Sequence, residues 1–334
     1  MTWLELLIIL VKIVVILLFA LGMVPILVWV ERKLVGHFQQ RIGPHRVGPD
    51  GILQGIADGL KLFLKEDIIP RQADKLLYVL APVLSLVPAL LIFAVIPFGP
   101  KVTIGGRQIE LYLADLNVAV LYVLALGSVG VYGVVLAGWS SNNKYSLLGA
   151  CRSAAQMVSY ELPLSVALIT PLMIVGSLSL VDIVQWQEQR VWLVLPGLLA
   201  FVVFMVCGIA EANRGPFDLP EAEQELIAGY LTEYSSFKFA MFFMAEYAHV
   251  ISVSAIATTV FLGGWDGPFL PPVVWFLIKL SILIFLFMWL RATLPRLRYD
   301  WLMKLGWLRL LPLALVSLFL TAVGMAVFGG WFRA

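Results

Sequence analysis

The sequence is divided into long apolar stretches that contain almost no charged residues. A helix needs about 20 apolar residues to cross a bilayer, and it satisfies its own backbone hydrogen bonds there. The alternating pattern of β-barrel strands is absent. The sequence therefore predicts an all-α polytopic membrane protein, with residues 1–334 forming a single membrane domain. About eight transmembrane helices are expected, near 4–30, 76–97, 117–138, 157–178, 192–210, 237–262, 273–290 and 308–330.

The composition agrees with this class. Hydrophobic residues make up 61% of the chain and charged residues 13%, whereas soluble domains average roughly 45–50% and about 25%. A soluble enzyme, a nucleic-acid-binding module and a disordered protein are thereby excluded. The first apolar stretch continues to Val30, which is too long for the core of a signal peptide. We expect it to be a retained span.

Lysine and arginine are distributed unevenly between the two sides of the predicted bundle. Segments 31–75, 139–156, 211–238 and 291–309 contain 17 of them, and the opposite side contains four. Because positive residues remain on the cytoplasmic side, these segments are predicted to lie inside and both termini outside. Lys12 and Lys279 fall within spans, close enough to the outer boundary to extend toward water. Their role stays open.

The first inside loop contains an amphipathic pattern at residues 50–66. Asp58, Lys61 and Lys65 occupy one side of a helix with this spacing. The pattern predicts a helix on the cytoplasmic membrane surface; a short helix beneath a partner subunit is the alternative. The opposite side is apolar, with Ile52, Leu53, Ile56, Leu60, Phe63 and Leu64.

Acidic residues gather around the fifth and sixth spans. Asp218 and Pro220 are typical of a helix start, and carboxylates near that end are stabilised by the helix dipole. A capped acidic helix is therefore one interpretation. Crowded carboxylates in a low dielectric cannot all ionise, which makes them candidates for proton handling. The group comprises Glu211, Asp218, Glu221, Glu223, Glu225, Glu233 and Glu246.

Two carboxylates are predicted to lie inside spans, Glu161 and Glu246. An ionisable group at membrane depth costs at least about 2.5–3.5 kcal/mol, so it persists mainly where it is paired or lines a polar path. We expect a functional role for both, although Glu161 could instead lie at the membrane interface. His249, three residues after Glu246, is either a packed histidine or a proton relay.

No redox or metal motif is present. Cys151 and Cys207 cannot supply the four ligands that an iron–sulfur cluster usually needs. The three histidines form no metal-binding motif, and no glycine-rich nucleotide fingerprint occurs. We expect any redox cofactor to be bound by another polypeptide.

Two long motifs resemble one family. The first runs from Glu31-Arg32-Lys33 to Lys65-Glu66, and the second from Glu211-Ala212-Asn213-Arg214 to Ala245-Glu246-Tyr247. Over essentially the whole chain, including the eight-span layout, the sequence is similar to the membrane-embedded H subunits (subunit 1) of respiratory complex I, the proton-translocating NADH:quinone oxidoreductase. Gly215 and Ser236 stand where the family motif varies.

The resemblance implies a subunit between the membrane arm and the peripheral arm that forms much of the quinone-access chamber. The first inside loop 31–75, with its amphipathic helix 50–66, and the acidic inside loop 211–236 would then face peripheral-arm subunits that carry the quinone site and the terminal iron–sulfur cluster. FMN and the other clusters are expected in partner subunits, and further membrane-arm subunits adjoin. The substrate would be ubiquinone or menaquinone, with no residue of this chain catalysing electron transfer.

The resemblance also implies roles for individual residues. Arg214 could alternatively form only a salt bridge with Glu211 or Asp218. The basic inside loop 291–309 could simply set orientation and contact anionic lipid. The proton-coupling carboxylates would be Glu161, Glu211, Glu221, Glu223, Glu225, Glu233 and Glu246. The quinone chamber would involve Arg32, Arg41, Asp58, Arg214, Asp218, Phe242, Phe243, Arg291 and Arg296.

Three alternatives remain at this stage. The equivalent subunit of a membrane-bound hydrogenase or formate hydrogenlyase would share the fold. A stand-alone cation/proton transporter could use Glu161, Glu246 and Lys279, but the internal repeat common in transporters is absent. A passive anchor would leave the intramembrane carboxylates unexplained. No targeting peptide is recognised, which favours a multi-pass protein of the bacterial plasma (inner) membrane, although an organelle-encoded chain would look similar.

Overall fold

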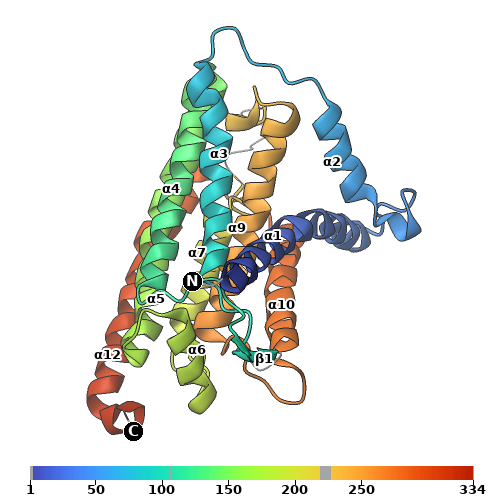
Figure 1. The fold of residues 1–334 in the computed structure, drawn as a ribbon. Helices are drawn as coiled ribbons and strands as arrows, with labels where there is room; N and C mark the ends of the chain where they lie inside the picture. The colour runs from blue at the N-terminus through green and yellow to red at the C-terminus, as the bar shows by residue number, and fades with distance from the viewer. Residues whose placement is uncertain (1–2, 105–106, 219–226, 334) are drawn as a thin grey trace.

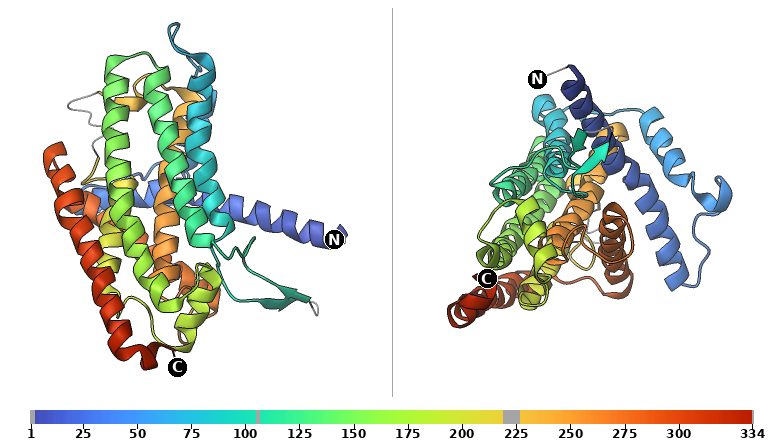
Figure 2. Two further views of the ribbon diagram at one scale, coloured as in Figure 1. Left: turned by 90° about the vertical axis from the view of Figure 1, so that its left-hand side faces the viewer. Right: turned by 60° about the horizontal axis from the view of Figure 1, so that its bottom comes forward.

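The structure is a computed structural model that describes residues 3–104, 107–218 and 227–333. Its long helices stand side by side as a bundle (Figure 1), and α1 (Trp3–Phe38) lies across that bundle, as the left view of Figure 2 shows. The other long helices are α3 (Lys75–Leu91), α4 (Ala119–Ser140), α5 (Lys144–Val175), α9 (Ser236–Phe261), α10 (Pro272–Thr293) and α12 (Leu311–Arg333).

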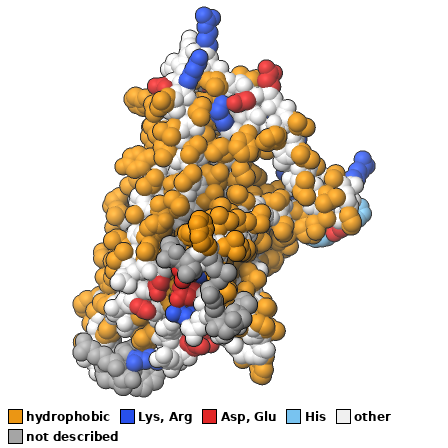
Figure 3. Space-filling view, viewed as in Figure 1, with side chains coloured by type: hydrophobic (Ala, Val, Ile, Leu, Met, Phe, Trp, Pro, Cys, Tyr) orange, Lys and Arg blue, Asp and Glu red, His pale blue; other side chains and the backbone are white. Residues whose placement is uncertain are grey.

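The predicted fold class is confirmed. In the described ranges, seven helical stretches are long and apolar enough to cross a membrane, the last of them running through α11 (Tyr299–Leu305) into α12. In Figure 3 hydrophobic side chains cover most of the visible face, and charged side chains gather toward its ends. The chain is an all-α polytopic membrane protein.

The fifth predicted span, 192–210, forms the shorter helix α7 (Leu198–Glu211). At 1.5 Å per residue, its 14 residues extend only ~21 Å of the ~30 Å hydrocarbon core. The preceding backbone is irregular, but it finds partners within the protein: the Val194 amide donates to the Phe261 carbonyl (2.8 Å) and the Leu193 amide to Gln187 Oε1 (3.0 Å). Irregular backbone at membrane depth is tolerated where protein surrounds it.

Two helices are longer than their predicted spans. Helix α1 continues past Val30 to Phe38, and α5 begins at Lys144, in the segment expected to be a loop. Small side chains explain the early start of α5, because Gly149 lies so close to Gly229 that an added Cβ would be 2.7 Å from its Cα. Tertiary packing therefore extends this helix beyond its apolar core.

The predicted amphipathic helix is present as α2 (Gln54–Leu64), preceded by the short 3-10 turn η1 (Pro49–Gly51). It lies beside α1 and α9 at the edge of the bundle (Figure 1). None of its side chains is buried in this chain, and Phe63 and Leu64 are among the most exposed apolar residues.

Short elements connect the long helices, and the span pattern does not predict them. At one end of the bundle are an antiparallel hairpin, β1 (Val102–Ile104) and β2 (Arg107–Ile109), and the helix α6 (Leu180–Gln189). Thr103 pairs with Gln108 in the hairpin. The remaining short turns are η2 (Ile92–Ala94), η3 (Gly229–Leu231) and the π turn η4 (Gly306–Leu310).

Candidate functional site

A cluster of buried charged side chains joins α1, α9, α10 and the segment that follows α7. Glu31 of α1 accepts hydrogen bonds from Tyr247 Oη (2.8 Å) and from Arg291. Arg214 contacts Glu31 (3.6 Å) and pairs through Nε with Glu246 Oε1 (2.5 Å). Only 7% of Arg214 and 9% of Glu31 is exposed. We call these five residues the ion cluster.

Helical spacing brings Glu31 into the protein. Val24, Leu27, Val28 and Glu31 recur at intervals of three and four residues, so they share one face of α1, and all four are buried. The guanidinium of Arg214 also lies over the Tyr247 ring, 4.1 Å from its centroid. This cation–π contact holds the guanidinium within reach of the Glu31 and Glu246 carboxylates.

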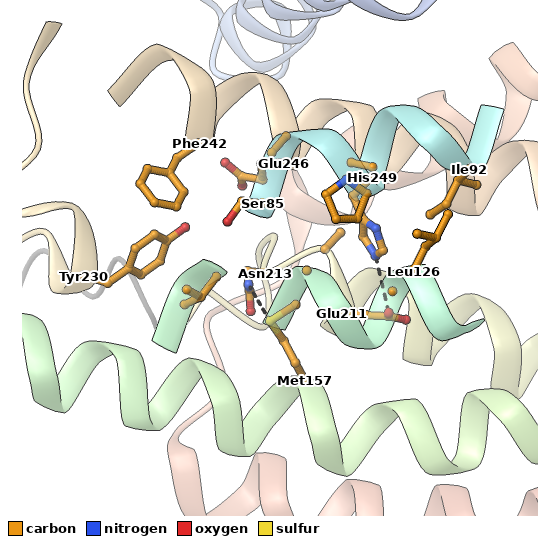
Figure 4. Close-up of a pocket in the computed structure, with 17 residues that line it drawn as sticks. Ser85, Ile92, Leu126, Met157, Glu211, Asn213, Tyr230, Phe242, Glu246 and His249 are labelled. Atoms are coloured by element: carbon orange, nitrogen blue, oxygen red, sulfur yellow. Dashed lines mark hydrogen bonds and ion pairs between the residues drawn. The ribbon is translucent and has the colours of Figure 1, made fainter. Parts of the chain in front are cut away.

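Next to the ion cluster is a small cavity, which we call the carboxylate pocket. Glu246, Glu211 and His249 face it together with Asn213 and Ser85, as Figure 4 shows. Its volume is about 60 Å³. His249 Nε2 lies 3.7 Å from Glu211 Oε1. A cavity needs only about 10–15 Å³ to hold one water molecule, so this polar pocket has room for water.

Glu161 extends the same line of groups. It is in the middle of α5, accepts a hydrogen bond from Ser128 of α4, and shares a second cavity of about 20 Å³ with Glu211 and His249. Because α5 begins at Lys144, well before the expected start of the span, the interfacial interpretation of Glu161 is wrong. The structure places it between helices.

On the other side of α9 is a larger cavity, bounded by α1, α2 and α9, which we call the α2 cavity. Its volume is about 680 Å³, which is within the usual range of about 300–1,000 Å³ for ligand pockets. The lining is mostly apolar, with Arg32 and Asp58 as a polar pair joined at 2.5 Å. Asp58 is further held by Gln54 Nε2 (3.0 Å).

Phe243 links the α2 cavity to the ion cluster. Its side chain lines the α2 cavity, its ring centroid is 5.8 Å from the Arg214 guanidinium carbon, and its ring meets Tyr247 edge-on at 5.0 Å. One aromatic ring therefore separates an apolar, ligand-sized cavity from a buried group of charges.

The structure separates the sequence-predicted residues into several groups. Phe242 turns away from Phe243 and lines the carboxylate pocket, with its ring against Tyr230 and Tyr234. Arg291 joins the ion cluster, whereas Arg41 and Arg296 are exposed. Three predicted carboxylates, Glu221, Glu223 and Glu225, lie outside the described residues.

Other predicted positions lie elsewhere. Glu233 follows η3, where its carboxylate accepts from Asn143 Nδ2 and its carbonyl from Tyr78 Oη, both at 2.6 Å. Asp218 is half-buried. In the exposed first loop, hydrogen bonds with Lys33 and His45 hold the pKa of Asp50 below its usual value.

The structure adds two partners to Arg214 and corrects the interpretation of Lys279. The ion pairs described for Arg214 are with Glu246 and Glu31, which the fold brings in from other helices, and its pairing with Glu211 or Asp218 stays a prediction. Lys279 does not extend toward water: it is 6% exposed and donates to the carbonyls of Leu262, Gly264 and Asp266.

Sequence reasoning assigned no site role to Glu31 or Tyr247, and it left His249 open between a packed histidine and a proton relay. The spacing of Glu31 behind Val24, Leu27 and Val28 is a usable signal, since it predicts a carboxylate on a buried face. No such signal identifies Tyr247, because its partner Glu31 is on a distant helix. In the described part of the chain, no group of three or more His, Cys, Asp or Glu residues could hold a metal ion.

Comparison with known proteins identifies the family. The sequence profile of the NADH dehydrogenase family matches residues 11–322. The first of two NADH-quinone oxidoreductase H subunits of Geobacter sulfurreducens is 54% identical over 93% of this chain and 93% of its own length. The second H subunit of Geobacter metallireducens is 55% identical, with coverages of 93% and 94%. The H subunit of Thermomicrobium roseum is 53% identical, with coverages of 91% and 92%. The chain therefore belongs to the family of NADH-quinone oxidoreductase H subunits.

Proposed function

We propose that this chain forms the wall of a quinone-access chamber, together with peripheral-arm subunits, and couples quinone reduction to proton translocation. The observation that carries the proposal is the position of Phe243 between the α2 cavity and the ion cluster. A change of charge in the α2 cavity would act on the ion cluster across the width of this one ring. The surroundings are apolar and screen charge poorly, so the electrostatic effect would be strong.

The α2 cavity suits a quinone by shape and polarity. A quinone consists of a polar ring and a long apolar tail. The apolar side chains of Phe63, Phe239 and Met244 offer contacts for the tail, and the Arg32–Asp58 pair offers polar groups toward the ring. Because α2 is unburied in this chain, partner subunits would complete the chamber.

Electron transfer itself would occur in the partners. The family membership supports an assembly in which other subunits hold FMN and the iron–sulfur clusters and deliver electrons to the quinone. This chain would then act on protons and charge, as one subunit of a translocase in a bacterial inner membrane.

The buried carboxylates provide the coupling in this proposal. Quinone reduction creates negative charge and requires protons. Arg214 contacts both Glu31 and Glu246, so a charge that draws it toward the α2 cavity would weaken its hold on Glu246. Glu246 would then favour its protonated form. Glu246, Glu211 and Glu161 share successive cavities, along which such a change would pass as one coupled titration.

Filling the α2 cavity tests the proposed quinone chamber. Gly59 lines the cavity and has no heavy atom within 4 Å of a built Cβ, so Gly59→Phe would fill the space without displacing the backbone. In the purified complex we expect the KM for quinone to rise about tenfold, equivalent to ~1.4 kcal/mol of lost binding. NADH oxidation by a water-soluble acceptor should be unchanged.

The matched control is Gly22→Phe on α1. Gly22 is equally open but lies outside the cavity lining, so this variant should retain the normal KM. An unchanged quinone KM in an assembled Gly59→Phe complex would contradict the proposed chamber.

A further inference from the structure

Helix α2 is attached to the bundle at both ends, with the α2 cavity between the attachments. At its first turns, Gly55 packs directly on α1, where an added Cβ would be 2.7 Å from Pro25. The Arg32–Asp58 pair holds the same region at 2.5 Å. The far end of α2 has no such close contact with α1 in the described contacts, and its attachment is to the start of α9.

That second attachment is made by two serine hydroxyls. Ser236 Oγ donates to the carbonyl oxygens of Lys65 (2.8 Å) and Leu62 (3.1 Å). Ser235 Oγ accepts from the Ile68 amide at 3.3 Å. The last carbonyls of a helix lack hydrogen-bond donors within the helix. Ser236 therefore supplies a donor that water would otherwise provide at the end of α2.

Ser236 makes this contact from a backbone conformation that disfavours it. Its φ is +58°, in the left-handed region that glycine adopts without cost and most other residues avoid. A glycine would relieve the strain but would have no hydroxyl. A strained residue persists where its surroundings hold it, and here the bonds to α2 are the interactions that only the serine side chain provides.

Ser236 also belongs to the helix face that forms the cavity wall. Phe239, Ala240 and Phe243 line the α2 cavity and follow Ser236 at three, four and seven residues, which is the spacing of one helical face. Lys238 adds an ion pair to Asp67 at 2.7 Å, just beyond α2. The attachment is therefore continuous with the α9 side of the cavity.

We propose that Ser236 is a positioning residue that fixes the far end of α2 and so sets the width of the α2 cavity for an apolar-tailed substrate. This inference rests on the proposed function, in which that substrate is quinone. Ser236 does not touch the reacting ring. It acts through α2, and releasing it leaves α2 hinged at the Gly55 end.

The experiment compares Ser236→Gly and Ser236→Ala with wild type in the assembled complex. Hydrogen exchange of the amides in 54–65 should become roughly tenfold faster in both, because the end of the helix opens locally. The KM for a long-tailed quinone should change severalfold with kcat retained. Ser236→Gly should keep or raise the melting temperature, because it relieves strain. Faster exchange in α2 could then not be attributed to a general loss of stability.

The matched control is Ser281→Ala, since Ser281 is exposed on α10 and donates only to Leu277 of its own helix among the described contacts. It should alter neither exchange in α2 nor quinone KM. Unchanged exchange in both Ser236 variants would overturn the proposal. Faster exchange with normal quinone kinetics, alongside a raised KM in Gly59→Phe, would overturn the positioning role and leave the quinone chamber intact. A normal KM in Gly59→Phe would overturn the chamber itself.

Discussion

At the scale of single residues, the ion cluster is organised by Arg214. It is the group that contacts both Glu31 and Glu246, and its planar fork can bind two carboxylates at once while its face rests on Tyr247. Lysine would keep the charge but lose both features. The position therefore requires an arginine and not merely a positive charge.

Arg214→Met should destabilise the subunit strongly. Removing one partner of a buried pair leaves uncompensated charge and typically costs about 3–5 kcal/mol. Thermal inactivation of the purified complex would measure the loss. Adding Glu246→Gln should recover part of it, because the carboxylate that paired with Arg214 Nε is then replaced by a neutral amide, while Glu31 keeps Arg291 as a partner. If the double variant lost as much as the two single variants combined, Arg214 and Glu246 would not be coupled.

Glu161→Gln tests the proton-coupling role of Glu161 while leaving its structural role in place. The glutamine oxygen can still accept from Ser128, so the fold should be retained, but the side chain can no longer titrate. We expect quinone reduction to continue with fewer protons moved per NADH, measured as acidification in reconstituted vesicles. Glu188→Gln, on an exposed position of α6, is the control. Normal pumping in Glu161→Gln would favour a subunit that only anchors the peripheral arm.

At the scale of helices, apolar periodicity predicts which segments form spans but not where their ends fall. The sixth span is predicted at 237–262, and α9 covers Ser236–Phe261, because its apolar limits coincide with its helical limits. Helices α5 and α7 differ because neighbouring elements determine their ends, through Gly149 against Gly229 and Val194 against Phe261.

The candidate site was predictable to a similar degree. Motif positions identify the carboxylates, but pairing depends on the fold. Nothing in the adjacent pair Phe242 and Phe243 indicates that one faces the carboxylate pocket and the other the α2 cavity. Glu31 and Glu246, which pair with Arg214, lie on α1 and α9. No local spacing in the sequence predicts that these residues contact Arg214.

Helix α2 offers a matched pair of glycines for a test at this scale. Both Gly55→Ala and Gly59→Ala should gain about 1 kcal/mol of helix propensity. At Gly59 the space is open, whereas at Gly55 the new methyl group meets Pro25 at 2.7 Å. We expect Gly55→Ala to displace α2 and speed proteolysis of the 31–75 loop, with Gly59→Ala normal. Equal protease resistance would mean that α2 is not seated on Pro25.

At the scale of the whole molecule, two of the segments predicted to lie inside reach the same end of the bundle. The loop before α3 and the start of α5 lie at the upper end of Figure 1, and the hairpin and α6 lie at the lower end. The arrangement agrees with the charge asymmetry of the sequence, in which the inside segments contain 17 lysines and arginines against four outside. It makes a definite prediction about which end faces the cytoplasm.

Labelling with a membrane-impermeant thiol reagent tests that orientation. Cys207 is buried and Cys151 exposed, so Cys151→Ser provides an unreactive background. In that background Arg71→Cys should label only in inside-out vesicles, because its loop faces the cytoplasm, and Glu188→Cys only in right-side-out vesicles; both positions are exposed. The reverse pattern would put the α2 cavity and the ion cluster on the side away from the cytoplasm, where NADH-dependent partners could not reach them. Orientation is thus a condition that the proposed quinone chamber must satisfy, independent of any activity measurement.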